Sequence, residues 1–126
     1  MNTNEAPPIE SPSSRNNPCF GNDPTTAALN VFADDGHSYL LPYAQFLSAE
    51  RFSNPALEQK PDAPPEKMLI RFAQAEIVML GSGLKTIEGG IQKYRLQFVK
   101  SADRRLAATL NTHIAAVTIT FTKENA

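Results

Sequence analysis

The chain has 126 residues, of which 41% are hydrophobic and 20% are charged, and its formal net charge is −1. This composition is typical of a single globular domain with a polar tail, and it is not that of a strongly basic nucleic-acid binder. No apolar run approaches the roughly 20 residues that span a bilayer, and no basic segment followed by an apolar one begins the chain. With Cys19 as the only cysteine, an internal disulfide is excluded, and we expect a cytoplasmic protein without a membrane segment.

The two halves of the chain differ in charge. Residues 1–66 contain nine acids and three bases, a balance of −6, whereas residues 67–126 contain four acids and nine bases, a balance of +5. Such an asymmetry can mark a basic face for an anionic partner, or it can reflect an acidic solubilising tail and solvated strand faces. We favour the second interpretation.

Residues 1–24 are rich in Asn, Pro, Ser and Thr, and their X-Pro pairs disfavour helix. We predict a disordered tail here, because its few large apolar side chains bury too little surface to offset the conformational entropy that ordering would cost. Ile9 and Phe20 are the exceptions and can dock on the domain. Cys19 is expected to be an exposed, inert thiol.

The predicted domain spans residues 25–123. Residues 28–33 alternate as a first strand, Asp34-Asp35-Gly36 is the strongest hairpin signal in the chain, and residues 37–41 form the returning strand. Pro42 ends that strand, and residues 43–46 form a turn or one helical turn. Residues 47–52 are a third strand or the end of a short helix, and the proline-rich residues 53–66 form a long loop.

The densest apolar stretch covers residues 68–99. We predict a strand over 68–72, a tight turn within 73–76 and a buried strand over 77–80, with one long bulged strand as the alternative. Leu84, Ile87 and Ile91 form a helical stripe, so a short helix is expected over about 83–92. Gly89-Gly90 and the alternation of Tyr94, Leu96 and Phe98 then favour a strand from about 93 to 100 over continued helix, with those three side chains on its core face.

A connector over 101–111 leads to a last strand in which Val117, Ile119 and Phe121 alternate with threonines, and residues 124–126 fray. The predicted fold class is therefore α+β. It is a small antiparallel, hairpin-rich curled sheet of five to seven short strands with one short helix, preceded by the disordered tail.

Catalytic and metal-binding patterns are missing from the sequence. Gly81-Ser82-Gly83 lacks the third glycine of a dinucleotide fingerprint and the Gly-Lys-Ser/Thr of a phosphate loop. His37 and His113, with one cysteine, do not have the spacing of a zinc site. We therefore predict no catalytic residue, no metal site and no cofactor.

One segment of the sequence is basic and could either bind an anionic partner or simply form solvated strand faces. It contains six cations within 21 residues: Lys85, Lys93, Arg95, Lys100, Arg104 and Arg105. With Tyr94 and Phe98 between them, these residues are candidates for nucleic-acid or anion contact. The structural explanation is that Tyr94 and Phe98 lie on the core face of the predicted strand, where their rings would be buried and could not contact a nucleic acid.

Three functional hypotheses follow. We favour a small non-catalytic protein-interaction or assembly module whose edge strands pair with a partner or with a second copy. The alternative is a nucleic-acid-binding domain that uses the basic 85–105 segment. An enzyme or small-ligand carrier would require a pocket that gathers His37, Tyr43 or Glu76.

Overall fold

The computed structural model describes residues 17–122 and folds them into two four-stranded sheets, one α-helix and three short 3-10 helices. Sheet A has the strand order β1-β7-β2-β3, and sheet B has the order β4-β5-β6-β8. The strands are β1 (Phe20–Asn22), β2 (Ala28–Phe32), β3 (Ser38–Pro42), β4 (Phe46–Ser53), β5 (Glu66–Phe72), β6 (Ala75–Ser82), β7 (Leu96–Lys100) and β8 (His113–Phe121). The helices are α2 (Lys85–Gln92), η2 (Tyr43–Gln45), η3 (Pro55–Glu58) and η4 (Arg104–Leu106).

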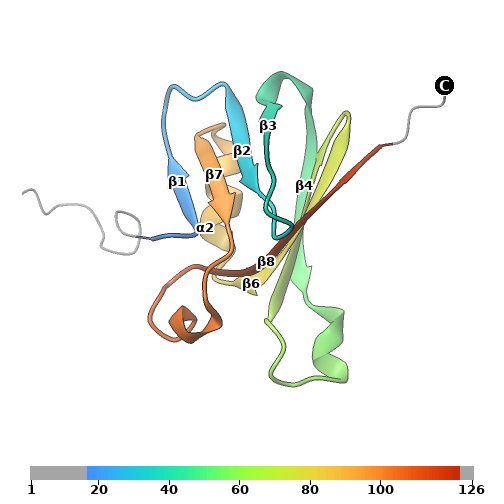
Figure 1. The fold of residues 1–126 in the computed structure, drawn as a ribbon, viewed down its shortest axis with the longest axis vertical. Coiled ribbons are helices and arrows are strands. Elements are labelled where there is room, and N and C mark those ends of the chain that lie inside the picture. The colour runs from blue at the N-terminus through green and yellow to red at the C-terminus, as the bar shows by residue number, and fades with distance from the viewer. Residues whose placement is uncertain (1–16, 123–126) are drawn as a thin grey trace, which may run out of the picture.

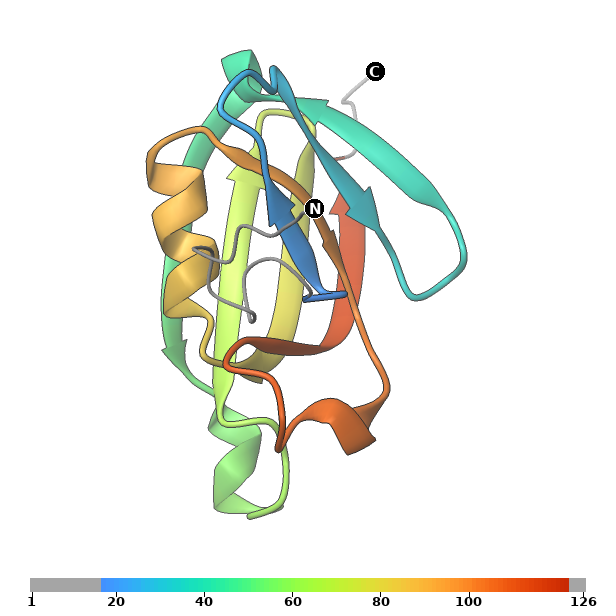
Figure 2. The same cartoon turned by 90° about the vertical axis from the view of Figure 1, so that its left-hand side faces the viewer.

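The α+β class is confirmed, but the described residues form eight strands in two sheets instead of one curled sheet of five to seven strands. In Figure 1 the strands of sheet A and those of sheet B stand on opposite sides of the molecule, and β8 crosses between them. Figure 2 shows α2 beside β4 at one margin of this arrangement. Ile87 and Ile91 of α2 are buried with the inward side chains of both sheets in one core.

Sheet A combines an expected hairpin with an unexpected pairing. The β2–β3 hairpin at Asp34-Asp35-Gly36 is confirmed, and Gly36 has the positive φ of 93° that such a turn needs. The parallel pairing of β2 with β7 was not predicted. It joins residues nearly 70 positions apart, and local sequence patterns carry no information on such a partner.

Sheet B is antiparallel throughout and follows the alternation of its sequence. β5 and β6 form the predicted hairpin, with Ala73 and Gln74 between them. Met68, Ile70 and Ile77 are fully buried on one face, whereas Leu69 and Val78 are half-buried on the other. Residues 47–52, for which the sequence allows a strand or the end of a helix, belong to β4.

The predicted domain boundary after residue 24 is wrong. β1 pairs with β7, Phe20 docks in the core as expected, and Cys19 is fully buried instead of exposed. The side chain of Asn17 donates to the Thr112 carbonyl (2.8 Å) and accepts from the Cys19 amide (2.7 Å). These bonds fix a segment whose polar composition had suggested disorder. The predictions for residues 1–16, including Ile9, and for residues 124–126 lie outside the described residues.

Burial should make Cys19 a slow nucleophile. Desolvation raises the pKa of its thiol above the usual value, partly offset by the hydrogen bond that the Ile114 amide donates to Sγ. Because the thiolate is the reactive form, we expect disulfide exchange of Cys19 with an added disulfide reagent to be at least about 100-fold slower in native protein than in urea. A native rate equal to the denatured rate, followed with a chromogenic disulfide reagent, would contradict the buried position.

The expected core face of Tyr94, Leu96 and Phe98 is also wrong. Tyr94 precedes β7 with a positive φ of 55° and is 50% exposed. Within β7, Leu96 pairs with Asn22 and Phe98 with Gly21, so Gln97 is an extra residue in the ladder. This bulge turns Leu96 inward and Phe98 outward, because it breaks the period of two.

Candidate functional site

The six predicted contact cations do not converge on one site. All are exposed, and they occur in the first turn of α2, at its C-terminal cap, before β7, at the end of β7 and in η4: Lys85, Lys93, Arg95, Lys100, Arg104 and Arg105. Arg105 pairs with Asp103 at 3.1 Å, and Arg104 lies 4.0 Å from Asp62. Arg95 and Lys100 lie at opposite ends of β7, so the segment is spread along the molecule instead of forming one basic patch.

The residues of the enzyme or ligand-carrier hypothesis are likewise separated. His37 follows the β2–β3 turn beside Asp35. Tyr43 is buried, its hydroxyl donates to the Leu96 carbonyl, and desolvation raises the pKa of its phenol. Glu76 pairs with Arg71 at 2.9 Å on sheet B. Among residues 17–122, no group of three or more His, Cys, Asp or Glu side chains is placed to hold a metal ion.

A different surface concentrates unusual features: the outward face of sheet A. On β2 the outward residues are Ala28, Asn30 and Phe32, because Leu29 and Val31 point into the core. Asn30 pairs with Leu40 of β3 on one side and with Phe98 of β7 on the other. We call the surface formed by Ala28, Asn30, Phe32, Leu40, Phe98 and Lys100 the Asn30 face.

The Asn30 face exposes apolar groups that a sheet normally covers. Leu40 is 68% exposed, the largest value among the exposed large hydrophobic residues of the described chain. Phe32 and Phe98 meet edge to face with centroids 6.1 Å apart, and the Lys100 ammonium lies 5.8 Å from the centre of the Phe32 ring. Leu40 is exposed and Phe32 and Phe98 are half-buried, so apolar groups stay accessible on this outward face, as is typical of an interaction surface.

Gly21 is needed to position the Phe98 ring. A Cβ at Gly21 would lie 2.5 Å from Cε1 of Phe98, so the ring can extend over β1 only because this position is glycine.

Asn30, at the centre of the face, has an unsatisfied polar group. Its Oδ1 is buried and accepts no hydrogen bond from any residue that the structure describes. It borders a depression of about 450 Å³ that Leu40 and Phe98 also line. A buried acceptor without a donor costs about 1–3 kcal/mol, so a turn of the side chain that brings Oδ1 to an outside donor would be favourable here.

Sequence reasoning missed this face because it treated each strand separately. The signal that was present is an asparagine between two apolar residues, Ala28 and Phe32, on one side of a strand. Its meaning depends on knowing that Leu40 and Phe98 are its neighbours, which only the sheet order reveals.

The edges of sheet B are less available than we expected. β8 has part of its outer edge occupied, since the Asp34 amide donates to the Val117 carbonyl (2.9 Å) and the Val117 amide donates to Asp34 Oδ2 (3.0 Å). β4 is interrupted by an irregular register between Phe46 and Ser48. Bulges and covered edges are devices that oppose edge-to-edge pairing.

Within residues 17–122, no helix is both long enough and apolar enough to cross a membrane. Comparison of the chain with protein-family models, with curated proteins and with solved structures found no match in any of the three. We therefore base the functional proposal on the Asn30 face.

Proposed function

We propose that the chain is a non-catalytic assembly module that self-associates through the Asn30 face. The observation that carries the proposal is the unsatisfied Oδ1 of Asn30 between the exposed Leu40 and the half-buried Phe98. A protein partner that covers this row can supply the missing donor once the Asn30 side chain turns its Oδ1 outward. A second copy of the chain supplies that donor, because the Asn30 amide carries both an acceptor and two donors.

The geometry of the row suits a two-fold arrangement. Leu40 and Phe98 flank Asn30 on opposite sides. Consider two copies whose Asn30 faces meet, related by a two-fold axis that lies between the two sheets and runs parallel to β2. This axis places Leu40 of one copy over Phe98 of the other and brings the two Asn30 side chains together. With both side chains turned so that Oδ1 faces the other copy, each amide donates to the other, and the apolar groups on both sides are removed from water.

Charge does not oppose such a contact. The chain has a net charge of −1, so two copies repel each other little. Lys100 is the single cation among the residues that define the face, and its ammonium lies by the Phe32 ring. We place self-association on this face, and not on the edges of sheet B, because those edges are bulged or partly covered.

Leu40→Glu should weaken self-association by at least about tenfold in dissociation constant, because it places a carboxylate against the partner's aromatic ring. Sedimentation velocity over a concentration series measures the constant. Leu47→Glu is the matched control, because Leu47 is 65% exposed but lies in sheet B. The dissociation constant for self-association of this variant should stay within about twofold of the wild-type value. Equal losses in both variants, or no loss in Leu40→Glu, would remove the Asn30 face from the account.

Binding of a single-stranded nucleic acid on the same face is the second candidate function. It is favoured by one observation: two aromatic rings on neighbouring central strands with a lysine beside them, since bases stack on such rings and phosphates bind such cations. Fluorescence anisotropy with labelled RNA and DNA oligonucleotides separates the two functions. This candidate requires salt-sensitive binding that Phe98→Ala and Lys100→Glu abolish and that Arg104→Glu with Arg105→Glu leaves intact.

A further inference from the structure

A depression of about 480 Å³ lies between the β2–β3 turn and the end of β7. It is lined by Phe32 and Lys100 of the Asn30 face, by Ser101, and by the turn residues Asp34, Gly36 and His37. Because Phe32 and Lys100 belong to both, the depression continues the Asn30 face toward the turn. A second copy seated on that face would therefore reach the depression as well.

The two acids of the turn differ in how fully their oxygens are used. In Asp34, Oδ1 accepts from the Ser101 hydroxyl (2.7 Å) and Oδ2 accepts from the Val117 amide (3.0 Å). In Asp35, Oδ1 accepts from the His37 amide (2.9 Å), a bond that lowers the pKa of this carboxyl. The second oxygen of Asp35 accepts no hydrogen bond from any residue that the structure describes, and its side chain is 58% exposed. Asp35 can therefore bind a cation from outside the chain.

Lys100 is a cation that has an aromatic neighbour but no carboxylate. Its ammonium lies 5.8 Å from the centre of the Phe32 ring. None of the ion pairs within residues 17–122 includes it. A partner that covers the Asn30 face removes water from this ammonium, which costs free energy unless an anion replaces the water. The proposed interface therefore needs an acid near Lys100.

The two-fold axis along β2 brings such an acid to the lysine. Rotation about this axis keeps every residue at its level along β2 and exchanges the two sides of the strand. The turn lies on the β3 side of β2, and Lys100 lies on the β7 side at the level of Phe32. The turn of the second copy therefore comes to lie on the side of Lys100. Packed sheets are about 10 Å apart, a gap that extended lysine and aspartate side chains can span.

We propose that Asp35 of each copy forms an ion pair with Lys100 of the other, in the depression beside the turn. This inference rests on the proposed self-association through the Asn30 face. The two pairs determine how the copies are aligned, because a two-fold axis across the strands would carry the turn to the far end of the other copy. Apolar contacts discriminate weakly between these alignments, whereas opposite charges that must meet discriminate strongly.

Charge reversal in the full chain tests the ion pair. Lys100→Glu and Asp35→Lys should each raise the dissociation constant for self-association at least about fivefold, because the two-fold axis creates two contacts between like charges. The variant with both substitutions restores opposite charges, so its constant should return to within about threefold of the wild-type value. Sedimentation velocity over a concentration series measures all three constants.

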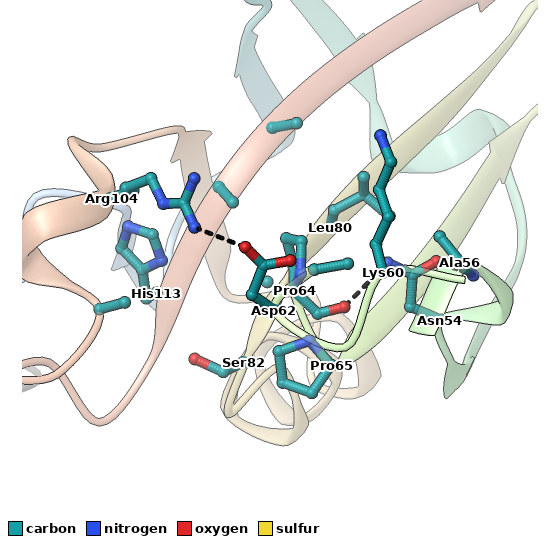
Figure 3. A pocket seen from close by; sticks show the side chains of 15 residues that line it. Asn54, Ala56, Lys60, Asp62, Pro64, Pro65, Leu80, Ser82, Arg104 and His113 are labelled. Atoms are coloured by element: carbon teal, nitrogen blue, oxygen red, sulfur yellow. Dashed lines mark hydrogen bonds and ion pairs between the residues drawn. The ribbon is translucent and has the colours of Figure 1, made fainter. Parts of the chain in front are cut away.

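Arg104 and Asp62 provide controls with the same changes in charge. They lie 4.0 Å apart at one end of a groove of about 640 Å³ that shares no residue with the Asn30 face (Figure 3). Both side chains are more than three-quarters exposed. Arg104→Glu and Asp62→Lys should therefore each leave the dissociation constant within about twofold of the wild-type value.

Asp35→Asn removes the charge and keeps the turn, because its side-chain oxygen can still accept from the His37 amide. The wild-type dissociation constant should rise with salt, and this variant should show a weaker rise. Single variants no weaker than their controls, or a double variant whose losses simply add, would overturn the ion pair and leave the Asn30 face standing. A wild-type chain that stays monomeric would overturn both.

Discussion

Gly81→Ala should destabilise the fold by about 3 kcal/mol, a large part of the stability of a domain of this size. A Cβ at Gly81 would lie 2.0 Å from the His113 carbonyl oxygen and 3.1 Å from the Ile114 Cα. Both atoms belong to the backbone of β8, which approaches Gly81 where the β6–β8 register shifts. The strands have to separate to admit a methyl group, so urea unfolding should show a lower midpoint.

Gly89→Ala is the control for this substitution. Gly89 lies in α2, and nothing lies within 4 Å of the position that its Cβ would take. Alanine has a higher helix propensity than glycine, so we expect stabilisation by about 0.5–1 kcal/mol. If Gly81→Ala were as stable as the wild type, the close approach of β8 at this position would be wrong.

Ile77→Ala should cost about 2–5 kcal/mol, because it leaves a cavity at the centre of sheet B. Ile77 is fully buried, and its cross-strand partners are Ile70 of β5 and Ile119 of β8. A row of three isoleucines across three strands cannot close around a missing side chain without moving the strands.

Val78→Ala tests the same strand on its other face. Val78 is half-buried, so its truncation should cost about 1 kcal/mol or less in urea unfolding. The difference between the neighbouring variants reports directly on which face of β6 meets the core. Equal costs at the two positions would contradict the two-sheet arrangement.

Local patterns predicted much of this fold. The Asp-Gly turn between β2 and β3, the β5–β6 hairpin, the short helix and the last strand, β8, depend on residues close in sequence, and all four are confirmed. The division into two sheets depends on pairings between distant segments, above all β2 with β7, and no local pattern encodes it.

Two errors arose where a local rule is overridden by tertiary contacts. Residues 17–24 look like a disordered tail, but Asn17 and Cys19 make buried hydrogen bonds to the segment that begins β8. In β7 a single extra residue, Gln97, reverses the side on which Phe98 lies. Because of that reversal, the Phe98 ring lies on the Asn30 face and not on the core face that the sequence predicted.

The sequence predicted the class of function that we propose but not the residues of the site. The sequence indicated an interaction module without catalytic residues, and that remains the proposal. The residues that carry it changed from strand edges and a basic segment to a row across sheet A, because Leu40, Asn30 and Phe98 become neighbours only in the folded sheet.

The most direct test of the proposed self-association is an isotope-filtered NMR experiment on a mixture of labelled and unlabelled chains. It detects only contacts between protons of different molecules. We predict intermolecular contacts between the Leu40 methyl groups of one copy and the Phe98 ring of the other, together with contacts between the two Asn30 amides. Intermolecular contacts confined to other surfaces, or a chain that stays monomeric at the concentration of the experiment, would contradict the account.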